Sequence, residues 1–302
     1  MPVAVVTDST AYLPPELVRA HRLTVVPLTV VLNGAEGLEG VETFPADATR
    51  ALAGRRVSVS TSRPSPEQFA ETYRGLLAAG APGVVSVHLS AELSGTVEAA
   101  RLAAVEVGDR VEVVDSRSTG LGLGFPVLAA AEAAEAGADL AGVRDAALAA
   151  VDRTTIFFYV DTLEFLRRGG RINAAEALFG TALSVKPIMH MPNGAIVVRD
   201  KVRTASRGVA RLVDLAVEAA GDADVDLGVH HLAAPQRAAR LVEALTDRLG
   251  DRLHDTYVCE AGAVVAAHAG PGLASVVVHR RPGVDDRRPS AGPGEPTAAG
   301  QQ

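Results

Sequence analysis

Two short hydroxyl-rich turns carry the residue types that could hold a small anion. Thr61 and Ser62 stand in the first turn, and Ser94, Gly95 and Thr96 form the second. Each turn lies between an apolar run typical of a strand and an amphipathic segment typical of a helix. Hydroxyls and backbone N–H groups at a helix N-terminus are suited to donating hydrogen bonds to an anion. The pattern therefore predicts a cluster of neutral donors that suits a carboxylate.

Each turn also has an ordinary structural explanation. Ser65 and Gln68 have the spacing of a capping box, so helix capping accounts for Ser65. Thr61 and Ser62 precede that cap, although a Thr-Ser pair in a turn more often bonds its own backbone. The second turn is equally consistent with a simple N-cap. A shared site is favoured because turns after consecutive parallel strands meet at the carboxyl edge of the sheet, where ligands collect.

A histidine and a group of cations could complete the site. His268 precedes a Gly-Pro-Gly turn that would fix the direction of its side chain. Two roles are equally compatible with this position: a hydrogen-bond donor beside a carboxylate, or an ordinary half-buried histidine. Arg171 follows Gly169-Gly170, whose flexible backbone would present its side chain. For the cation cluster, a solvated face and a site for an anionic head group or acidic partner both remain open. The cluster comprises Arg167, Arg168, Arg171, Lys186, Arg199, Lys201, Arg203 and Arg207.

The composition argues against several other classes of site. The formal charge of −7 does not fit a protein that binds duplex nucleic acid, and the single cysteine, Cys259, allows neither an internal disulfide nor a cysteine metal cluster. The histidines lack metal-motif spacing, and His230-His231 is interpreted as structural. Because no phosphate-binding loop is present, the glycine run 120–124 is interpreted as close helix–sheet packing or the lining of a narrow apolar cavity. We therefore expect no metal and no nucleotide cofactor.

The elements that must position these residues alternate along the chain, which predicts parallel βαβ units. We predict an α/β fold with two α/β domains, a mainly parallel three-layer domain over residues 1–153 and a domain with a mixed sheet and helices over 154–281. Residues 282–302 are rich in Pro, Gly and charge and predict a disordered tail. Predicted strands cover 3–7, 23–31, 83–89, 111–115, 155–160, 195–202, 225–230 and 275–279; predicted helices cover 66–79, 96–107, 125–136, 140–151, 173–183, 207–220 and 235–249.

The chain carries no segment that reads as a membrane anchor. The N-terminal apolar run is too short for a signal peptide, and charged residues interrupt the alanine-rich stretch 128–151. We expect a cytoplasmic protein without an integral membrane segment.

These motifs together resemble the DegV family, whose characterised members include the fatty-acid-binding subunits of bacterial fatty acid kinase. The matching stretches run in family order from about residue 3 to residue 280. Arg63 departs from the family pattern, which usually has Gln there, and residues 33–47 diverge as well. The stretches include Val5-Val6-Thr7-Asp8-Ser9-Thr10-Ala11, Thr61-Ser62-Arg63-Pro64-Ser65, Leu93-Ser94-Gly95-Thr96, Leu166-Arg167-Arg168-Gly169-Gly170-Arg171-Ile172, Lys201-Val202-Arg203 and His268-Ala269-Gly270-Pro271-Gly272.

The resemblance implies a long-chain fatty acid bound in an apolar tunnel between two α/β domains. It implies that Thr61 and Ser94 hold the carboxylate, that His268 belongs to the same polar network, and that Arg171 and Arg203 face the kinase partner. The remaining turn residues, Ser62, Gly95 and Thr96, would support the site. The chain itself would be a lipid-binding component in phospholipid metabolism, while a separate ATP-dependent kinase subunit forms the acyl phosphate. Transient membrane contact is compatible with this role.

Two alternatives stay open at this point. A stand-alone enzyme acting on a small carboxylate or phosphate would use His268 as its acid or base, but it needs a nucleophile or cofactor site that the sequence does not supply. A regulatory lipid sensor would share the ligand site and differ only in the partner that it contacts.

Overall fold

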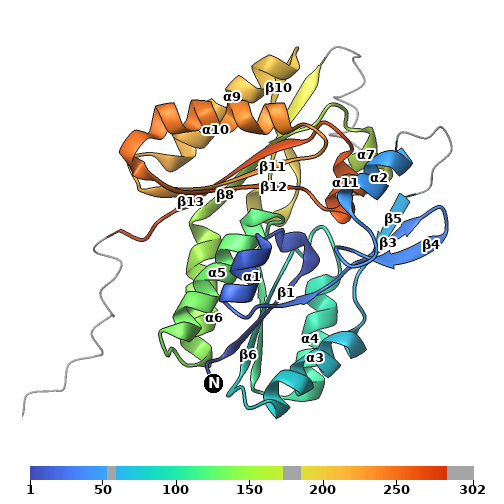
Figure 1. Cartoon of the computed structure of the whole chain (residues 1–302), viewed down its shortest axis with the longest axis vertical. Coiled ribbons are helices and arrows are strands. Elements are labelled where there is room, and N and C mark those ends of the chain that lie inside the picture. The colour runs from blue at the N-terminus through green and yellow to red at the C-terminus, as the bar shows by residue number, and fades with distance from the viewer. Residues whose placement is uncertain (53–58, 173–184, 284–302) are drawn as a thin grey trace, which may run out of the picture.

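The computed structural model describes residues 1–52, 59–172 and 185–283, and Figure 1 shows how its elements are arranged. It has a mixed α/β fold with one parallel sheet and one mixed sheet, which confirms the predicted fold class. The helix predicted over residues 173–183 lies outside the described residues, as does nearly all of the predicted tail. Among the described helices, none combines the length and the apolar character needed to cross a bilayer.

A four-stranded parallel sheet forms the core of the first half of the chain. Its strands, in spatial order, are β2 (Thr24–Val26), β1 (Ala4–Asp8), β6 (Val84–His88) and β7 (Val111–Asp115). All five residues of β6 are buried, as is typical of a parallel strand that is covered on both faces.

Helices cover both faces of this sheet, so the first half has three layers (Figure 1). Val5 and Val85 point toward one helix pair, whereas Val6 and Val84 point toward the other. This alternation follows from the period of two along a strand. The first pair is α5 (Leu121–Glu135) and α6 (Leu140–Asp152), and the second pair is α3 (Pro66–Ala78) and α4 (Thr96–Val107).

A six-stranded sheet forms the core of the second half. Its neighbouring strands are antiparallel except for the last pair, β11 and β12. In spatial order the strands are β10 (Val197–Val202), β9 (Lys186–His190), β8 (Thr154–Tyr159), β13 (Ala274–Arg280), β11 (Val225–His231) and β12 (Leu253–Glu260). Figure 1 shows α9 (Ala205–Ala220) and α10 (Pro235–Leu249) together on one face of this sheet.

A small antiparallel sheet and three helices lie beside the second half. The sheet has the order β4 (Ala35–Leu38), β3 (Thr29–Leu32) and β5 (Val59–Ser62). The helices are α2 (Pro45–Leu52), α7 (Glu164–Arg168) and α11 (Ala263–Ala269). Leu28 and Val30 share a core with Phe158 and Leu166, so residues from the first half pack with later elements. The domain boundary near residue 153 stays a prediction.

The prediction of one continuous strand over residues 23–31 was wrong. This stretch forms two strands, β2 and β3, that belong to different sheets. Pro27 stands between them and has no N–H with which to continue a ladder. The remaining described elements are short: α1 (Pro15–Ala20) and three 3₁₀ turns, η1 (Ser9–Ala11), η2 (Pro192–Gly194) and η3 (Gly250–Arg252).

Candidate functional site

A cavity of about 330 Å³ lies between the loops of the parallel sheet and the inner face of the mixed sheet. This volume is within the range of small-molecule sites, about 300–1,000 Å³. Apolar side chains form most of its wall, among them Leu28, Leu89, Phe158, Leu166, Met191 and Leu273. An apolar interior of this kind favours a ligand with a hydrocarbon portion.

Two of the predicted site residues meet at this cavity. Thr61 Oγ1 lies 2.8 Å from His268 Nε2, although the residues are 207 positions apart in the chain. β5 supplies Thr61 and the last turn of α11 supplies His268. Thr61 therefore lies within a strand of the small antiparallel sheet. The expectation that both hydroxyl turns follow strands of one parallel sheet was wrong. Only the Ser94 turn does so.

His268 is a neutral partner for an anion at neutral pH. Burial, together with the charge of Arg171, lowers the pKa of His268 to about 4. Its Nδ1 atom has no hydrogen-bond partner among the described residues. A Cβ atom at Gly169 would lie 2.3 Å from Nδ1, so the glycine at this position lets the chain pass close to the ring. The imidazole is thus held by Thr61 on one side and backed by a glycine on the other.

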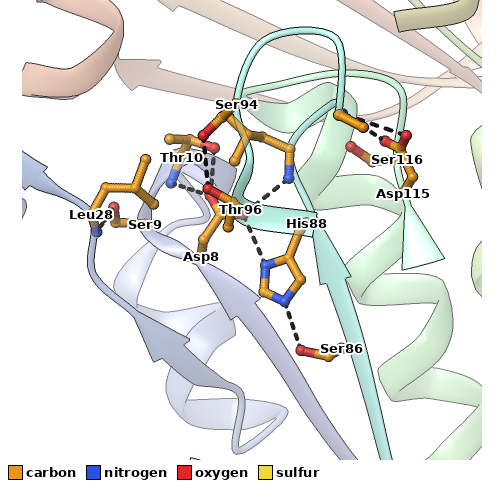
Figure 2. Close-up of polar contacts among 12 residues, drawn as sticks. Asp8, Ser9, Thr10, Leu28, Ser86, His88, Ser94, Thr96, Asp115 and Ser116 are labelled. Atoms are coloured by element: carbon orange, nitrogen blue, oxygen red, sulfur yellow. Dashed lines mark hydrogen bonds and ion pairs between the residues drawn. The ribbon is translucent and has the colours of Figure 1, made fainter. Parts of the chain in front are cut away.

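The Ser94 turn brings a second hydroxyl to the cavity. Ser94 Oγ lies 2.9 Å from Thr96 Oγ1, and Figure 2 shows the two side chains in contact. Gly95 is the N-cap position of α4 and offers no side chain of its own to that cap. The N–H groups of the first helical turn have no partner within the helix. Glu92 is exposed and is not part of the cavity wall, so its charge does not oppose an anion there.

Two arginines line the same part of the cavity. A Cβ atom at Gly95 would lie 1.8 Å from Arg63 Nη1, so the Arg63 guanidinium lies directly over the helix start. Arg171 Nε donates to the carbonyl of Leu93 at 3.1 Å, and its Nη1 donates to the carbonyl of Gly169. Neither arginine pairs with a carboxylate of the described residues. Arg203 is exposed between β10 and α9 and is not part of the cavity wall.

A buried network that the sequence did not reveal holds the loops under the cavity. The Asp8 carboxylate is fully buried and accepts hydrogen bonds from the N–H of Leu89 at 2.9 Å and from the hydroxyl of Thr10 at 2.6 Å. His88 Nδ1 lies 3.0 Å from Asp8 Oδ2, and its Nε2 lies 2.7 Å from Ser86 Oγ (Figure 2). These contacts fix the carboxyl ends of β1 and β6 and so position Leu89. The Asp-x-Thr spacing, typical of an Asx turn, is the one local signal for it.

His230 is also part of the cavity wall, which the structural interpretation of His230-His231 missed. Its Nε2 accepts a hydrogen bond from the N–H of Leu121 at 2.8 Å, and burial lowers its pKa to about 4. A Cβ atom at Gly120 would lie 2.7 Å from the same nitrogen. Gly120 is thus part of the cavity wall, whereas Gly122 and Gly124 are not part of it and pack closely against Ser118 and Leu13. No group of three potential metal-ligating side chains occurs among the described residues.

Comparison with protein families finds one match over nearly the whole chain. The model of the DegV family matches residues 2–281. A DegV domain-containing protein of Streptomyces coelicolor is 53% identical over 283 residues, covering 92% of this chain and 99% of that protein. One from Mycobacterium tuberculosis is 40% identical over 279 residues, covering 92% and 97%.

Solved structures share the same architecture. A fatty-acid-binding DegV family protein of Thermus thermophilus has a TM-score of 0.87 and is 35% identical, with 93% of this chain and 100% of that chain covered. The DegV fatty-acid-binding protein of Bacillus subtilis has a TM-score of 0.84 and is 31% identical, with the same coverage.

Proposed function

The chain belongs to the DegV family, and from this premise we propose that it binds a long-chain fatty acid with its carboxylate at Thr61, Ser94 and His268. The observation that carries the proposal is the 2.8 Å contact between Thr61 and His268 at the wall of a mainly apolar cavity. The fatty-acid-binding relatives of Thermus thermophilus and Bacillus subtilis support it.

The energetics of such a ligand fit the cavity. Each buried methylene contributes about 0.8 kcal/mol, so a long acyl chain gains enough free energy to offset the desolvation of one carboxylate. Hydrogen bonds to a charged acceptor contribute about 1.5–3 kcal/mol each. The Thr61 and Ser94 hydroxyls would donate such bonds, and Ser62, Gly95 and Thr96 would hold the two turns in place. The Arg63 and Arg171 guanidinium groups add favourable charge.

We further propose that the protein presents this carboxylate to a separate ATP-dependent kinase subunit in the cytoplasm. The kinase would transfer the γ-phosphoryl group of ATP to a carboxylate oxygen, releasing ADP and leaving an acyl phosphate in the cavity. Arg171 at the cavity and the exposed Arg203 would face the kinase. The lack of a phosphate-binding loop in this chain supports the need for a second protein.

Mass spectrometry of the denatured, purified protein tests the ligand. We expect a long-chain fatty acid to be released in roughly equimolar amount. Repeated absence of lipid, together with no binding when fatty acids are titrated into the delipidated protein, would refute the proposal.

Acyl phosphate formation with a fatty acid kinase subunit and ATP tests the partner. Arg203→Ala should lower acyl phosphate formation without changing fatty acid affinity, because Arg203 lies outside the cavity wall. The matched control is Arg240→Ala, an exposed arginine on α10. Equal rates for Arg203→Ala and wild type would remove Arg203 from the kinase surface, and a lipid-loaded protein that captures a different partner would favour the sensor.

A further inference from the structure

We infer that Tyr12 is the partition that closes the acyl cavity toward a second, outer groove and so limits the length of acyl chain that the protein accepts. This inference rests on the proposed fatty acid binding. It adds a specificity-determining residue that lies away from the carboxylate contacts.

The outer groove lies on the far side of the Tyr12 ring. It has a volume of about 740 Å³ and is lined by residues from β1 to α1, from the loop after β4 and from β12. Val41 and Val258 in its wall are 64% and 50% exposed, so the groove opens to solvent. Among the described lining residues of the two cavities, Tyr12 is the one that belongs to both. A single side chain therefore stands between the apolar interior and the outside at this point.

Several contacts hold the Tyr12 ring in this position. Its hydroxyl donates to Glu39 Oε1 at 3.0 Å and accepts from the N–H of Val265 at 3.2 Å. Its ring meets the His230 ring edge to face, with centroids 5.9 Å apart. A Cβ atom at Gly262 would lie 2.3 Å from Tyr12 Cε1. The ring is packed from three sides.

The partner carboxylate is itself anchored. Glu39 is 5% exposed, and burial raises its pKa. Its Oε2 accepts from Ser9 Oγ at 2.6 Å, and its Oε1 also accepts from the N–H of Val264 at 2.7 Å. Glu39 and Tyr12, both from the first half, thus satisfy N–H groups at the start of α11. The ring position is therefore tied to the same helix that carries His268.

The backbone of Tyr12 supports a role for this side chain. Tyr12 has φ 46° and ψ 37°, which is the left-handed region. This conformation costs a non-glycine residue about 1–2 kcal/mol, and such strain persists only where the surrounding structure holds the residue in place. A glycine would adopt the same conformation without that cost. The presence of a large ring at this position indicates that the ring itself is used.

The course of α11 shows how an acyl chain would reach Tyr12. His268 lies in the last turn of α11, whereas Tyr12 contacts its first turn through Val265. Val264, Val265 and Ala269 also line the cavity, so one face of the helix runs from the carboxylate site toward Tyr12. The helix rises about 6 Å from Val264 to His268, at about 1.5 Å per residue. An acyl chain that passes along this face of α11 therefore meets the Tyr12 ring.

Binding of fatty acids of increasing length tests the inference. We compare wild type, Tyr12→Gly and Tyr12→Phe by competition binding with saturated fatty acids of 14 to 22 carbons. Each additional buried methylene is worth about fourfold in affinity. We therefore expect Tyr12→Gly to raise the ratio of 22-carbon to 16-carbon affinity at least tenfold, because the chain would extend into the groove. Tyr12→Phe keeps the ring and should keep the wild-type length profile.

Two further variants serve as controls. Val258→Ala changes a groove residue that does not line the inner cavity and should leave the profile unchanged. Tyr12→Leu, which keeps apolar packing, gives an intermediate profile and serves if the glycine variant does not fold. If wild type binds fatty acids but Tyr12→Gly and Tyr12→Leu keep its length profile, the inference is overturned. If wild type binds no fatty acid of any length, the proposed function itself fails, and the inference with it.

Discussion

Ser65 and Ser94 are two serines in similar loop positions before a helix, and their neighbours give them different roles. Ser65 Oγ accepts from the N–H of Gln68 at 3.2 Å, and Gln68 Oε1 accepts from the N–H of Ser65 at 2.8 Å. This capping box confirms the role expected for Ser65. Ser94 makes no cap bond, and its hydroxyl contacts Thr96 at the cavity instead.

Alanine substitutions at these two serines should therefore affect different properties. Ser94→Ala should weaken fatty acid affinity by about tenfold or more, because a hydrogen bond to a charged group contributes about 1.5–3 kcal/mol. Ser65→Ala should leave affinity unchanged and lower the free energy of unfolding by about 1 kcal/mol, the usual cost of losing an N-cap. Titration calorimetry and urea denaturation measure the two quantities. Equal affinity losses in both variants would contradict the assignment of Ser94 to the ligand.

The residues of the site were easier to predict than their contacts. Thr61, Ser94 and His268 stand in short motifs that their own neighbours make conspicuous. The pairing of Thr61 with His268 spans 207 positions, and no local pattern encodes it. Tyr12 and His230 have cavity roles because η1, α11 and β11 converge, which again depends on the packing of distant elements.

At the scale of whole elements, α3 has a glycine in its last turn and α9 has one in its first turn, and the two glycines face different surroundings. Gly75 in α3 is exposed, and a Cβ atom there would meet nothing within 4 Å. A Cβ atom at Gly208 in α9 would lie 2.5 Å from Tyr159 Cδ2, and the Tyr159 ring is fully buried in β8. The close approach of α9 to the mixed sheet depends on that glycine.

The same substitution should therefore have opposite effects in the two helices. Gly75→Ala should raise the free energy of unfolding by up to about 1 kcal/mol, the difference in helix propensity. Gly208→Ala should lower it by about 1–3 kcal/mol, the usual cost of overpacking a core. Chemical denaturation of both variants measures the difference. A stabilised Gly208→Ala protein would mean that α9 does not pack on Tyr159 as described.

Helices with a clear apolar period were predicted almost residue for residue, as α4 and α10 show. Their pattern comes from one continuous buried face. Strands were harder where their partners are distant. β12 was missed because its exposed and half-buried residues at the sheet edge do not alternate regularly. β5 was predicted as part of a turn, because its four residues form a strand by pairing with β3 and this pairing leaves no local pattern in the sequence.

At the scale of the whole molecule, three buried histidines couple stability to pH. Burial lowers the pKa of His230, His268 and His279 to about 4, whereas in the unfolded chain a histidine has a pKa near 6.5. Between these values the unfolded state binds protons that the folded state does not. The contribution of the three neutral histidines to the free energy of unfolding is therefore complete above about pH 6.5 and is lost as the pH falls toward 4. Glu39 and Glu132, with raised pKa values, act in the opposite direction.

His279 offers the cleanest test because it does not line the cavity. It is 8% exposed, stacks on Phe125 at 4.9 Å and lies 2.8 Å from Thr154 Oγ1 through Nδ1. The pKa difference makes its contribution about 2 kcal/mol smaller at pH 5 than at pH 7. In His279→Gln, which keeps a group able to bond Thr154, the loss of unfolding free energy from pH 7 to pH 5 should shrink by that amount. Urea denaturation at pH 5, 7 and 8 measures it. Both proteins should behave in parallel between pH 7 and 8, and an unchanged slope below pH 7 would show that His279 takes up a proton in the folded state.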